Sequence, residues 1–246
     1  MQMDDRQRYS QWESGEGYNR YITAELESFR KIAWKRQILQ HFDARDAIRV
    51  LDVGTGPGFF ACILSEEGLE VTAIDQSEGM LQVARENAKK LGVSPSFLRM
   101  NVNHLDFPDE SFDLIVSRNV TWTLQYPEKV YAEFKRVLKP GGTLLIYDAN
   151  WHAHLYDPEL MEKVRAREEA HFRKYGTREI VTEDNPEFLA TCPMTRNQRP
   201  EWDERVLSDL GMTVEIQRDI GRFVYGDWEK ELYAESPLFE ICARKG

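Results

Sequence analysis

A glycine-rich segment, with an acidic residue farther along the chain, carries the clearest chemical signal. Glycines stand at positions 54, 56 and 58, directly after an apolar run, and Asp75 follows Gly54 by about 20 residues. Glycine lets a backbone adopt positive φ and approach a ligand closely, and an acid at that spacing suits the two hydroxyls of a ribose. These residues predict a nucleoside-binding loop.

Pro57 helps to decide which nucleoside-containing ligand the loop would bind. The dinucleotide motif needs a third glycine where this chain has Phe59, and Pro57 has no N–H to offer a pyrophosphate. A ligand without phosphate, such as S-adenosylmethionine (SAM), does not need these donors. The loop therefore favours SAM over a nicotinamide dinucleotide.

Alternating apolar strands and helices surround the loop and predict an α/β fold. Right-handed crossovers make this a doubly wound, mostly parallel, seven-stranded sheet of the Rossmann-like kind. We expect helices at 59–67, 78–91, 127–138 and 201–210, and strands at 48–53, 70–75, 97–100, 112–117, 143–148, 212–216 and 238–243.

The pattern divides the chain into four parts. An N-terminal helical lid segment, with one helix over Glu25–Phe42, covers residues 1–45, and the SAM-binding core covers 46–150. Residues 151–200 contain charged helical stretches and a polar loop, and we expect them to form a cap insertion over the active site. Residues 201–246 add a helix and the last two strands of the sheet.

Four segments in order, within residues 45–150, resemble the motifs of the class I SAM-dependent methyltransferases, in particular their small-molecule methyltransferase-like domains. The segments are Asp52–Gly58, Val71–Leu81, Phe107–Ser117 and Val137–Leu144. The resemblance implies a Rossmann-like methyltransferase fold, SAM as cofactor and methyl transfer as the activity.

The resemblance also implies the cofactor-binding residues. Asp52, Gly54, Thr55 and Gly56 would face the methionine end of SAM, Asp75 would bind the ribose hydroxyls, and Gln76 and Met80 would flank the adenine. Ser117 and Arg118 would line the methionine moiety and the reaction chamber. Asn101 stands where the family commonly has an acid at the adenine amino group; its carbonyl can still accept that hydrogen bond, with the Val102 N–H as a second contact.

Two further segments are expected to close the pocket. Aromatic residues of the lid, Tyr18 and Tyr21 among them, could attract a sulfonium or ammonium group, although core packing would explain them and Trp34 as well. Polar side chains follow the fourth and fifth strands, where open α/β sheets bind ligands. Arg118 could pair with a carboxylate of SAM or of the substrate, and His152 could act as a base. The candidate catalytic residues are Tyr18, Arg118, Asn150, His152 and Tyr175, the last sharing a helix face with His171.

Composition limits the partners. The net charge is −10 and the pI about 5.1, which argues against nucleic acid and anionic membrane surfaces as partners. The N-terminus lacks the features of a secretion signal and no apolar run could span a membrane, so we expect a cytoplasmic monomer or homodimer. Cysteine spacing predicts no metal site. Cys62 and Cys242 are expected in the core, and Cys192 at the surface.

The sequence therefore predicts a SAM-dependent methyltransferase acting on an oxygen, nitrogen or sulfur atom of a small molecule. Two alternatives stay open because a fold does not determine its substrate. One is a non-methylating SAM enzyme, in which cyclisation or lysis of SAM releases methylthioadenosine. The other is a catalytically silent SAM-binding partner protein.

Overall fold

A seven-stranded sheet forms the centre of the computed structural model, which describes residues 16–42, 48–176 and 185–246. The strand order is β3-β2-β1-β4-β5-β7-β6, and β7 runs antiparallel to both β5 and β6 while the other strands are parallel. The predicted doubly wound, mostly parallel sheet is confirmed. Its strands are β1 (Arg49–Val53), β2 (Glu70–Asp75), β3 (Ser96–Arg99), β4 (Phe112–Arg118), β5 (Leu138–Asp148), β6 (Met212–Gln217) and β7 (Phe239–Lys245).

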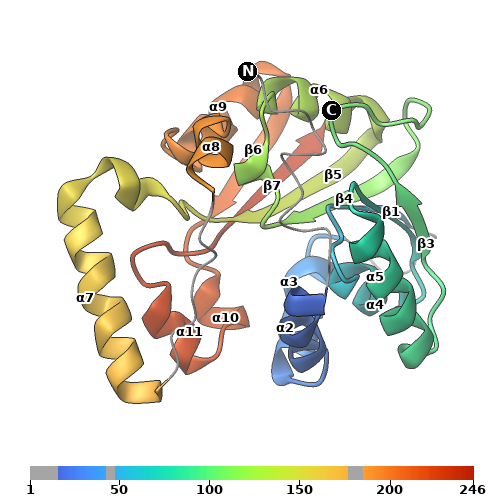
Figure 1. Ribbon diagram of the computed structural model, residues 1–246. Coiled ribbons are helices and arrows are strands. Elements are labelled where there is room, and N and C mark those ends of the chain that lie inside the picture. The colour runs from blue at the N-terminus through green and yellow to red at the C-terminus, as the bar shows by residue number, and fades with distance from the viewer. Residues whose placement is uncertain (1–15, 43–47, 177–184) are drawn as a thin grey trace.

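Helices cover both faces of the sheet (Figure 1). Side chains of α3 (Phe29–Leu39), α4 (Phe59–Ser65) and α5 (Glu78–Leu91) share one buried cluster with Val50 of β1. On the other face, α6 (Pro127–Val137) and α9 (Glu201–Asp209) share a second cluster with Leu51. Successive residues of β1 thus enter opposite cores, as the alternation of a strand requires.

Local capping fixes the helix that follows β2. The Ser77 hydroxyl accepts a hydrogen bond from the Met80 N–H at 3.1 Å, and α5 ends at Gly92, whose φ is +70°. Both are preferred capping residues, because serine satisfies a free N–H and glycine tolerates the left-handed region. The predicted helix over 78–91 is confirmed, and its N-cap fixes the position of the end of β2 beside the glycine loop.

The described part of the lid, residues 16–42, contains two helices where the sequence predicts one. α2 (Glu16–Leu26) ends before Ser28, and α3 begins at Phe29, where the Ser28 side chain accepts from the Arg30 N–H. The prediction of one continuous helix over Glu25–Phe42 is wrong, because Ser28 serves as an N-cap and breaks it. This break allows α2 to turn across the opening of the sheet.

β5 begins earlier than the sequence predicted. It starts at Leu138, which pairs with Phe112, and runs through Pro140-Gly141-Gly142, with a register shift before Thr143 pairs with Leu114. The sequence predicts a helix over 127–138 and a strand only from residue 143. The strand instead includes the proline and glycines, and its register with β4 shifts between Phe112 and Leu114.

A segment without any predicted element contains two short helices, α10 (Gly221–Val224) and α11 (Asp227–Leu232). Gly226 caps α11: the Glu229 carboxylate accepts from the Gly226 N–H at 2.9 Å. Ile220 and Val224 are fully buried in the cluster that also contains Trp34. Tertiary packing, which the sequence pattern does not reveal, thus explains why this segment folds here.

The predicted cap insertion contains helices and, among its described residues, no strand. Figure 1 shows α7 (Pro158–Tyr175) as an outlying helix beside α11. Lys174 of α7 pairs with Glu231 of α11, and Arg167 pairs with Glu235, which follows α11. The remaining elements of this region and of the loops are α8 (Pro186–Ala190) and the 3-10 helices η2 (Thr121–Thr123), η3 (Ala153–Tyr156) and η4 (Pro193–Thr195).

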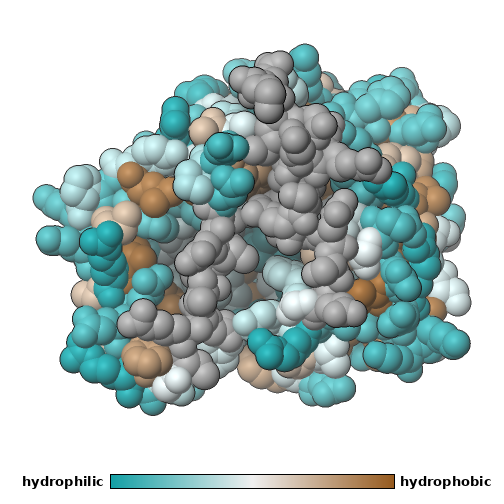
Figure 2. Space-filling view, in the orientation of Figure 1, coloured by the Kyte–Doolittle hydropathy of each residue, from teal (hydrophilic) through white to brown (hydrophobic). Residues whose placement is uncertain are grey.

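All three cysteines are buried, so the expected exposure of Cys192 is wrong. Cys192 is 1% exposed and shares a small cluster with Trp122 and Phe188. The face seen in Figure 2 is largely hydrophilic, with hydrophobic side chains in small separate groups. None of the helices described is long and apolar enough to cross a membrane.

Candidate functional site

A cavity of about 970 Å³ opens at the carboxyl edge of the sheet. Its wall combines the loop after β1, the ends of β2 and β4, the lid helices α2 and α3, and the segment around α10 and α11. Ligands in open α/β sheets bind at this edge. The volume lies at the upper end of the range for small-molecule sites, which leaves room for a cofactor and a second small molecule.

The glycine loop needs its glycines for two reasons. Gly54, Gly56 and Gly58 have φ values of +65°, +52° and +88°, which other residues rarely adopt. A Cβ at Gly54 would also collide with the Val120 side chain, whereas a Cβ at Gly56 would meet nothing within 4 Å. The loop therefore lies tight against the chain at Gly54 and is open at Gly56.

Most of the N–H groups of this loop are already used inside the protein. The Thr55 N–H donates to the Ile74 carbonyl at 3.0 Å, the Gly56 N–H to Asp75 at 2.9 Å and the Gly58 N–H to Thr55 at 2.9 Å. Pro57 has none. A pyrophosphate needs such donors, so the geometry agrees with the predicted preference for a ligand without phosphate.

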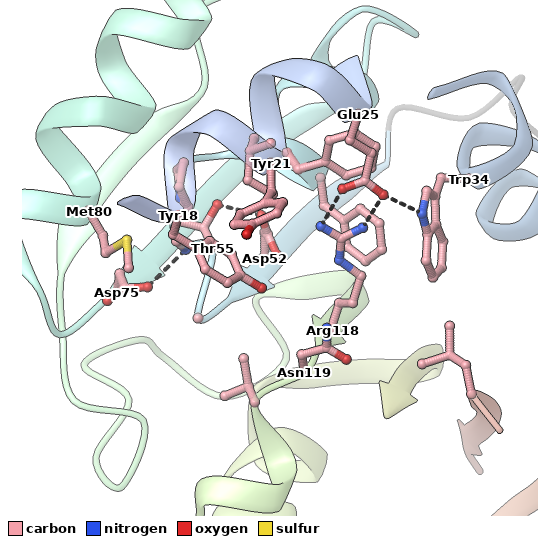
Figure 3. A pocket seen from close by; sticks show the side chains of 18 of the residues that line it. Tyr18, Tyr21, Glu25, Trp34, Asp52, Thr55, Asp75, Met80, Arg118 and Asn119 are labelled. Atoms are coloured by element: carbon pink, nitrogen blue, oxygen red, sulfur yellow. Dashed lines mark hydrogen bonds and ion pairs between the residues drawn. The ribbon is translucent and has the colours of Figure 1, made fainter. Parts of the chain in front are cut away.

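Asp75 lies at the end of β2, on the wall of the cavity (Figure 3). Its carboxylate accepts from the N–H groups of Gly56 and Ser77, both at 2.9 Å. Burial raises the pKa of the Asp75 carboxyl, against the effect of these hydrogen bonds. Gln76, Met80 and Val102 line the same part of the cavity, so the residues predicted around ribose and adenine are brought together there, apart from Asn101.

Asp52 lines the cavity but is only 2% exposed. Its Oδ2 accepts from the Thr55 hydroxyl at 2.6 Å and from the Ala61 N–H at 3.0 Å. Burial raises the pKa of the Asp52 carboxyl to about 6, although these hydrogen bonds oppose the shift. Asp52 therefore ties the glycine loop to the first turn of α4.

Arg118, at the end of β4, pairs with a carboxylate of the chain itself. Its two terminal nitrogens donate to Glu25 of α2 at 2.7 and 3.1 Å (Figure 3). Its guanidinium also lies 4.6 to 5.2 Å from the ring centroids of Phe59, Phe60 and Trp34. Burial alone would lower the pKa of Arg118, but Glu25 outweighs this effect and raises it. The Arg118–Glu25 pair fastens the lid to the sheet.

Glu25 is the centre of a larger charge network. It accepts from the Trp34 indole N–H at 2.9 Å and pairs with Arg30 at 2.8 Å. Arg30 in turn pairs with Glu229 of α11 at 2.6 Å. Ion pairs therefore connect the lid helices α2 and α3 to the end of β4 on one side and to α11 on the other.

Tyr18 and Tyr21 of α2 line the cavity, and both are more than 40% exposed. Figure 3 shows them beside Asp52 and Thr55, between Asp75 and Arg118. Trp34 is fully buried and packs against Phe60 and Tyr147. The lid thus supplies aromatic rings both to the open cavity and to the core beneath it.

A second group of aromatic residues lines the cavity, and we call it the aromatic end: Trp151, Tyr225, Trp228 and Tyr233. The Tyr233 ring lies 5.3 Å from Trp151 and 5.6 Å from Tyr225. Figure 1 shows α10 and α11 across α2 and α3 from α4 and α5. The aromatic end therefore lies opposite the helices that follow the glycine loop and Asp75.

Asp148, at the end of β5, positions the tryptophans beside the aromatic end. One of its oxygens accepts from the Trp122 N–H and the other from the Trp151 indole, both at 2.9 Å. Arg199 pairs with the same carboxylate at 2.8 Å, and both side chains are fully buried. His152 lines the cavity, is 5% exposed and lies 4.8 Å from the Trp122 ring.

Four candidate residues lie outside the cavity lining. The Ser117 hydroxyl is buried and has no hydrogen-bond partner, and Asn150 donates to the Arg199 carbonyl at 2.8 Å. Asn101 accepts from Asn103 in its own loop. Tyr175 is 38% exposed and lies 4.6 Å from His171 on α7. Of the predicted cap, only Trp151 and His152 line the cavity among the residues described.

The sequence did not single out several lining residues. Glu25, Glu229 and the α11 aromatic side chains carry no motif. Asn119 has a local signal only in the structure: its φ is +57°, and its buried side-chain oxygen has no hydrogen-bond partner. Unsatisfied atoms and strained backbone of this kind concentrate at functional sites.

Comparison with known proteins finds similarity to methyltransferases. Residues 51–146 match the methyltransferase domain family. The chain is 37% identical over 123 residues to the phosphatidylethanolamine N-methyltransferase of Cereibacter sphaeroides, covering 48% of this chain and 60% of that protein. It is 36% identical over 141 residues to the ubiquinone/menaquinone biosynthesis C-methyltransferase UbiE of Shewanella piezotolerans, covering 53% of each. The chain thus spans little more than half the length of these relatives.

Solved structures share the fold over most of the chain. A SAM-dependent methyltransferase from Aquifex aeolicus superposes with a TM-score of 0.57 at 24% identity, covering 92% of this chain and 98% of that one. Another from Methanosarcina mazei gives 0.56 at 23% identity, covering 85% and 96%. The structural similarity therefore extends well beyond the domain match.

Proposed function

We propose that this chain, whose residues 51–146 belong to the class I SAM-dependent methyltransferases, transfers the methyl group of SAM to a small-molecule acceptor. One observation carries the proposal: a single cavity of about 970 Å³ is lined both by the glycine loop and by the aromatic end. A methyl transfer needs cofactor and acceptor side by side, in line and away from water.

The residues present fit SAM. The loop is open at Gly56, its neighbouring N–H groups are occupied, and Asp75 offers a carboxylate for a diol. Gln76, Met80 and Val102 would hold the adenine. Asn119 Oδ1, which is buried and without a partner, suits a ligand N–H at the amino-acid end. When bound, SAM supplies a methyl group activated by the sulfonium charge.

The chain's own residues bind and orient the cofactor and the acceptor, and they exclude water from the cavity. Arg118 and the lid rings enclose the middle of the cavity, and Glu25 keeps Arg118 in place. Tyr18 and His152 line the cavity and are the candidate groups that could take a proton from an acceptor that arrives protonated. Asn150 and Tyr175 lie outside the lining.

The proposal is tested by incubating the protein with SAM, with and without the low-molecular-mass fraction of a cell extract, and measuring both nucleoside products by mass spectrometry. We expect S-adenosylhomocysteine only when the fraction is present. Gly54→Ala is the negative control, because the added Cβ collides with Val120 at a positive φ.

Two outcomes would contradict methyl transfer. Methylthioadenosine formed from SAM alone would show that the aminobutyrate chain of SAM reacts instead. Tight SAM binding with no product under either condition would indicate a silent SAM-binding protein.

A further inference from the structure

Most of the positive charges that line the cavity are already paired with carboxylates of the protein. Among the described lining residues are four carboxylates (Glu25, Asp52, Asp75, Glu229), three arginines (Arg20, Arg30, Arg118) and no lysine. Arg118 is bound by Glu25, and Arg30 by both Glu25 and Glu229. Arg20 is exposed on α2 beside the Tyr21 ring. Arg30 and Arg118, both partly buried, are therefore neutralised by the protein itself.

For an anionic acceptor, the exposed Arg20 is the one arginine among the described lining residues that lies outside this ion-pair network. A phosphate or carboxylate needs a free guanidinium or ammonium group to repay its desolvation. Releasing Arg30 would take from Glu229 the cation it pairs with, and releasing Arg118 would take from Glu25 one of its two cations. Both carboxylates are about 5% exposed, so either loss is costly. The charge of the whole protein, −10, adds a field that repels anions.

The aromatic end favours a cationic ligand over an anionic one. Trp151, Trp228 and Tyr233 each carry a negative π face, and faces of this kind attract cations. The protein already uses this property nearby, since the Arg30 guanidinium lies 5.6 Å from the Tyr225 ring centroid. A cationic group can therefore be held at this end without a dedicated carboxylate.

We propose that the aromatic end takes an acceptor bearing an alkylated amine, whose nitrogen is held against Trp151, Trp228 and Tyr233. This inference rests on the proposed methyl transfer and specifies its acceptor. The nitrogen lone pair forms the bond to the methyl carbon while the carbon–sulfur bond breaks and leaves its electron pair on sulfur. The positive charge moves from sulfur to nitrogen, where the rings stabilise it, and a proton leaves to solvent if the nitrogen carried one.

Three probes of similar size and shape test the class of ligand: choline, the neutral 3,3-dimethylbutan-1-ol and the anionic 3,3-dimethylbutanoate. Each is titrated by calorimetry, at millimolar concentrations, into protein saturated with S-adenosylhomocysteine. We expect choline to bind about 2- to 30-fold more tightly than the alcohol, as a cation–π contribution of about 0.5–2 kcal/mol implies, and the anion to give no binding.

Substitutions locate the effect. Trp228→Leu should bring the ratio of choline to alcohol affinity close to one, and Trp228→Phe should restore most of it because a π face remains. Phe223→Leu is the matched control: Phe223 lies on α10, is 47% exposed and does not line the cavity, so the ratio should not change.

The outcomes separate this inference from the proposed function. Protein that binds S-adenosylhomocysteine but prefers the alcohol or the anion, binds none of the probes, or keeps its choline preference in Trp228→Leu overturns the amine acceptor alone. Protein that fails to bind S-adenosylhomocysteine overturns the proposed function, and the inference with it.

Discussion

Four charged side chains alternate in sign along the inner wall of the cavity: Glu229, Arg30, Glu25 and Arg118. Consecutive members pair at 2.6, 2.8 and 2.7 Å. Buried charges persist only when paired, and breaking such a pair costs more than its net contribution to stability. Glu25 occupies the critical place because it is the only carboxylate that an ion pair joins to Arg118 among the described residues.

Glu25→Gln should destabilise the protein by about 3 kcal/mol, because two guanidinium groups lose their shared countercharge. In this variant, SAM should raise the melting temperature by more than methylthioadenosine does. The gap between the two ligand-induced shifts should be larger in the variant than in the unchanged protein. The reason is that SAM carries a carboxylate that can replace the lost charge at Arg118, whereas methylthioadenosine has none. Differential scanning fluorimetry measures all four shifts.

Glu27→Gln provides the control, since Glu27 follows α2 directly and is exposed. It should change neither stability nor the two ligand shifts by a measurable amount. If the difference between SAM and methylthioadenosine were the same in Glu25→Gln as in the unchanged chain, the cofactor carboxylate would not reach the Arg118 guanidinium that the substitution releases.

At the scale of elements, the end of β5 organises the loops around the aromatic end. Asp148 accepts five hydrogen bonds: from Thr121 and Trp122 of η2, from Ala149 and Trp151 after the strand, and from Arg199. Arg199 also pairs with Asp203 of α9. One carboxylate therefore connects β5, the loop after β4 and the chain that enters α9.

Asp148→Asn should lower the free energy of unfolding by about 3–5 kcal/mol, because Arg199 loses a countercharge and an NH₂ group faces existing donors. Asp113→Asn is the matched control: its pair with Lys139 is about one-third exposed, so we expect a loss below about 1 kcal/mol. Urea unfolding followed by tryptophan fluorescence measures both values. Equal losses would mean that the Asp148 network does not hold these elements together.

For the molecule as a whole, local patterns predicted the sheet and the glycine loop, because strand alternation, Ser77 and Gly92 act within a few residues. The Glu25–Arg118 pair joins positions 93 residues apart and has no local signal. The same holds for α10 and α11, which fold because Ile220 and Val224 enter the core under α3. The cofactor end of the site could therefore be predicted from motifs, whereas the aromatic end required the tertiary structure.

The predicted cap over residues 151–200 covers the site only in part, because the aromatic end comes mostly from residues farther along the chain. The sequence assigned the cover of the site to residues 151–200, but only Trp151 and His152 of this range line the described wall. The other lining residues after Thr123 are Tyr225, Gly226, Trp228, Glu229, Tyr233 and Leu238. Charge and apolar patterning identified a region without strands, yet they could not show which part of the C-terminal chain turns toward the cavity.

The most direct test of the account is a calorimetric titration of the protein with SAM, beside the same titration of Asp75→Asn and of NAD. Asp75→Asn keeps a carbonyl oxygen for one of the Gly56 and Ser77 N–H groups, which donate to different oxygens of the Asp75 carboxylate, and Glu78→Gln, an exposed neighbour, is the control. We predict one SAM bound per chain, at least about tenfold weaker binding in Asp75→Asn, unchanged binding in Glu78→Gln and none of NAD. No heat with SAM, or equal affinity in Asp75→Asn, would contradict the assignment of the glycine loop and Asp75 to this cofactor.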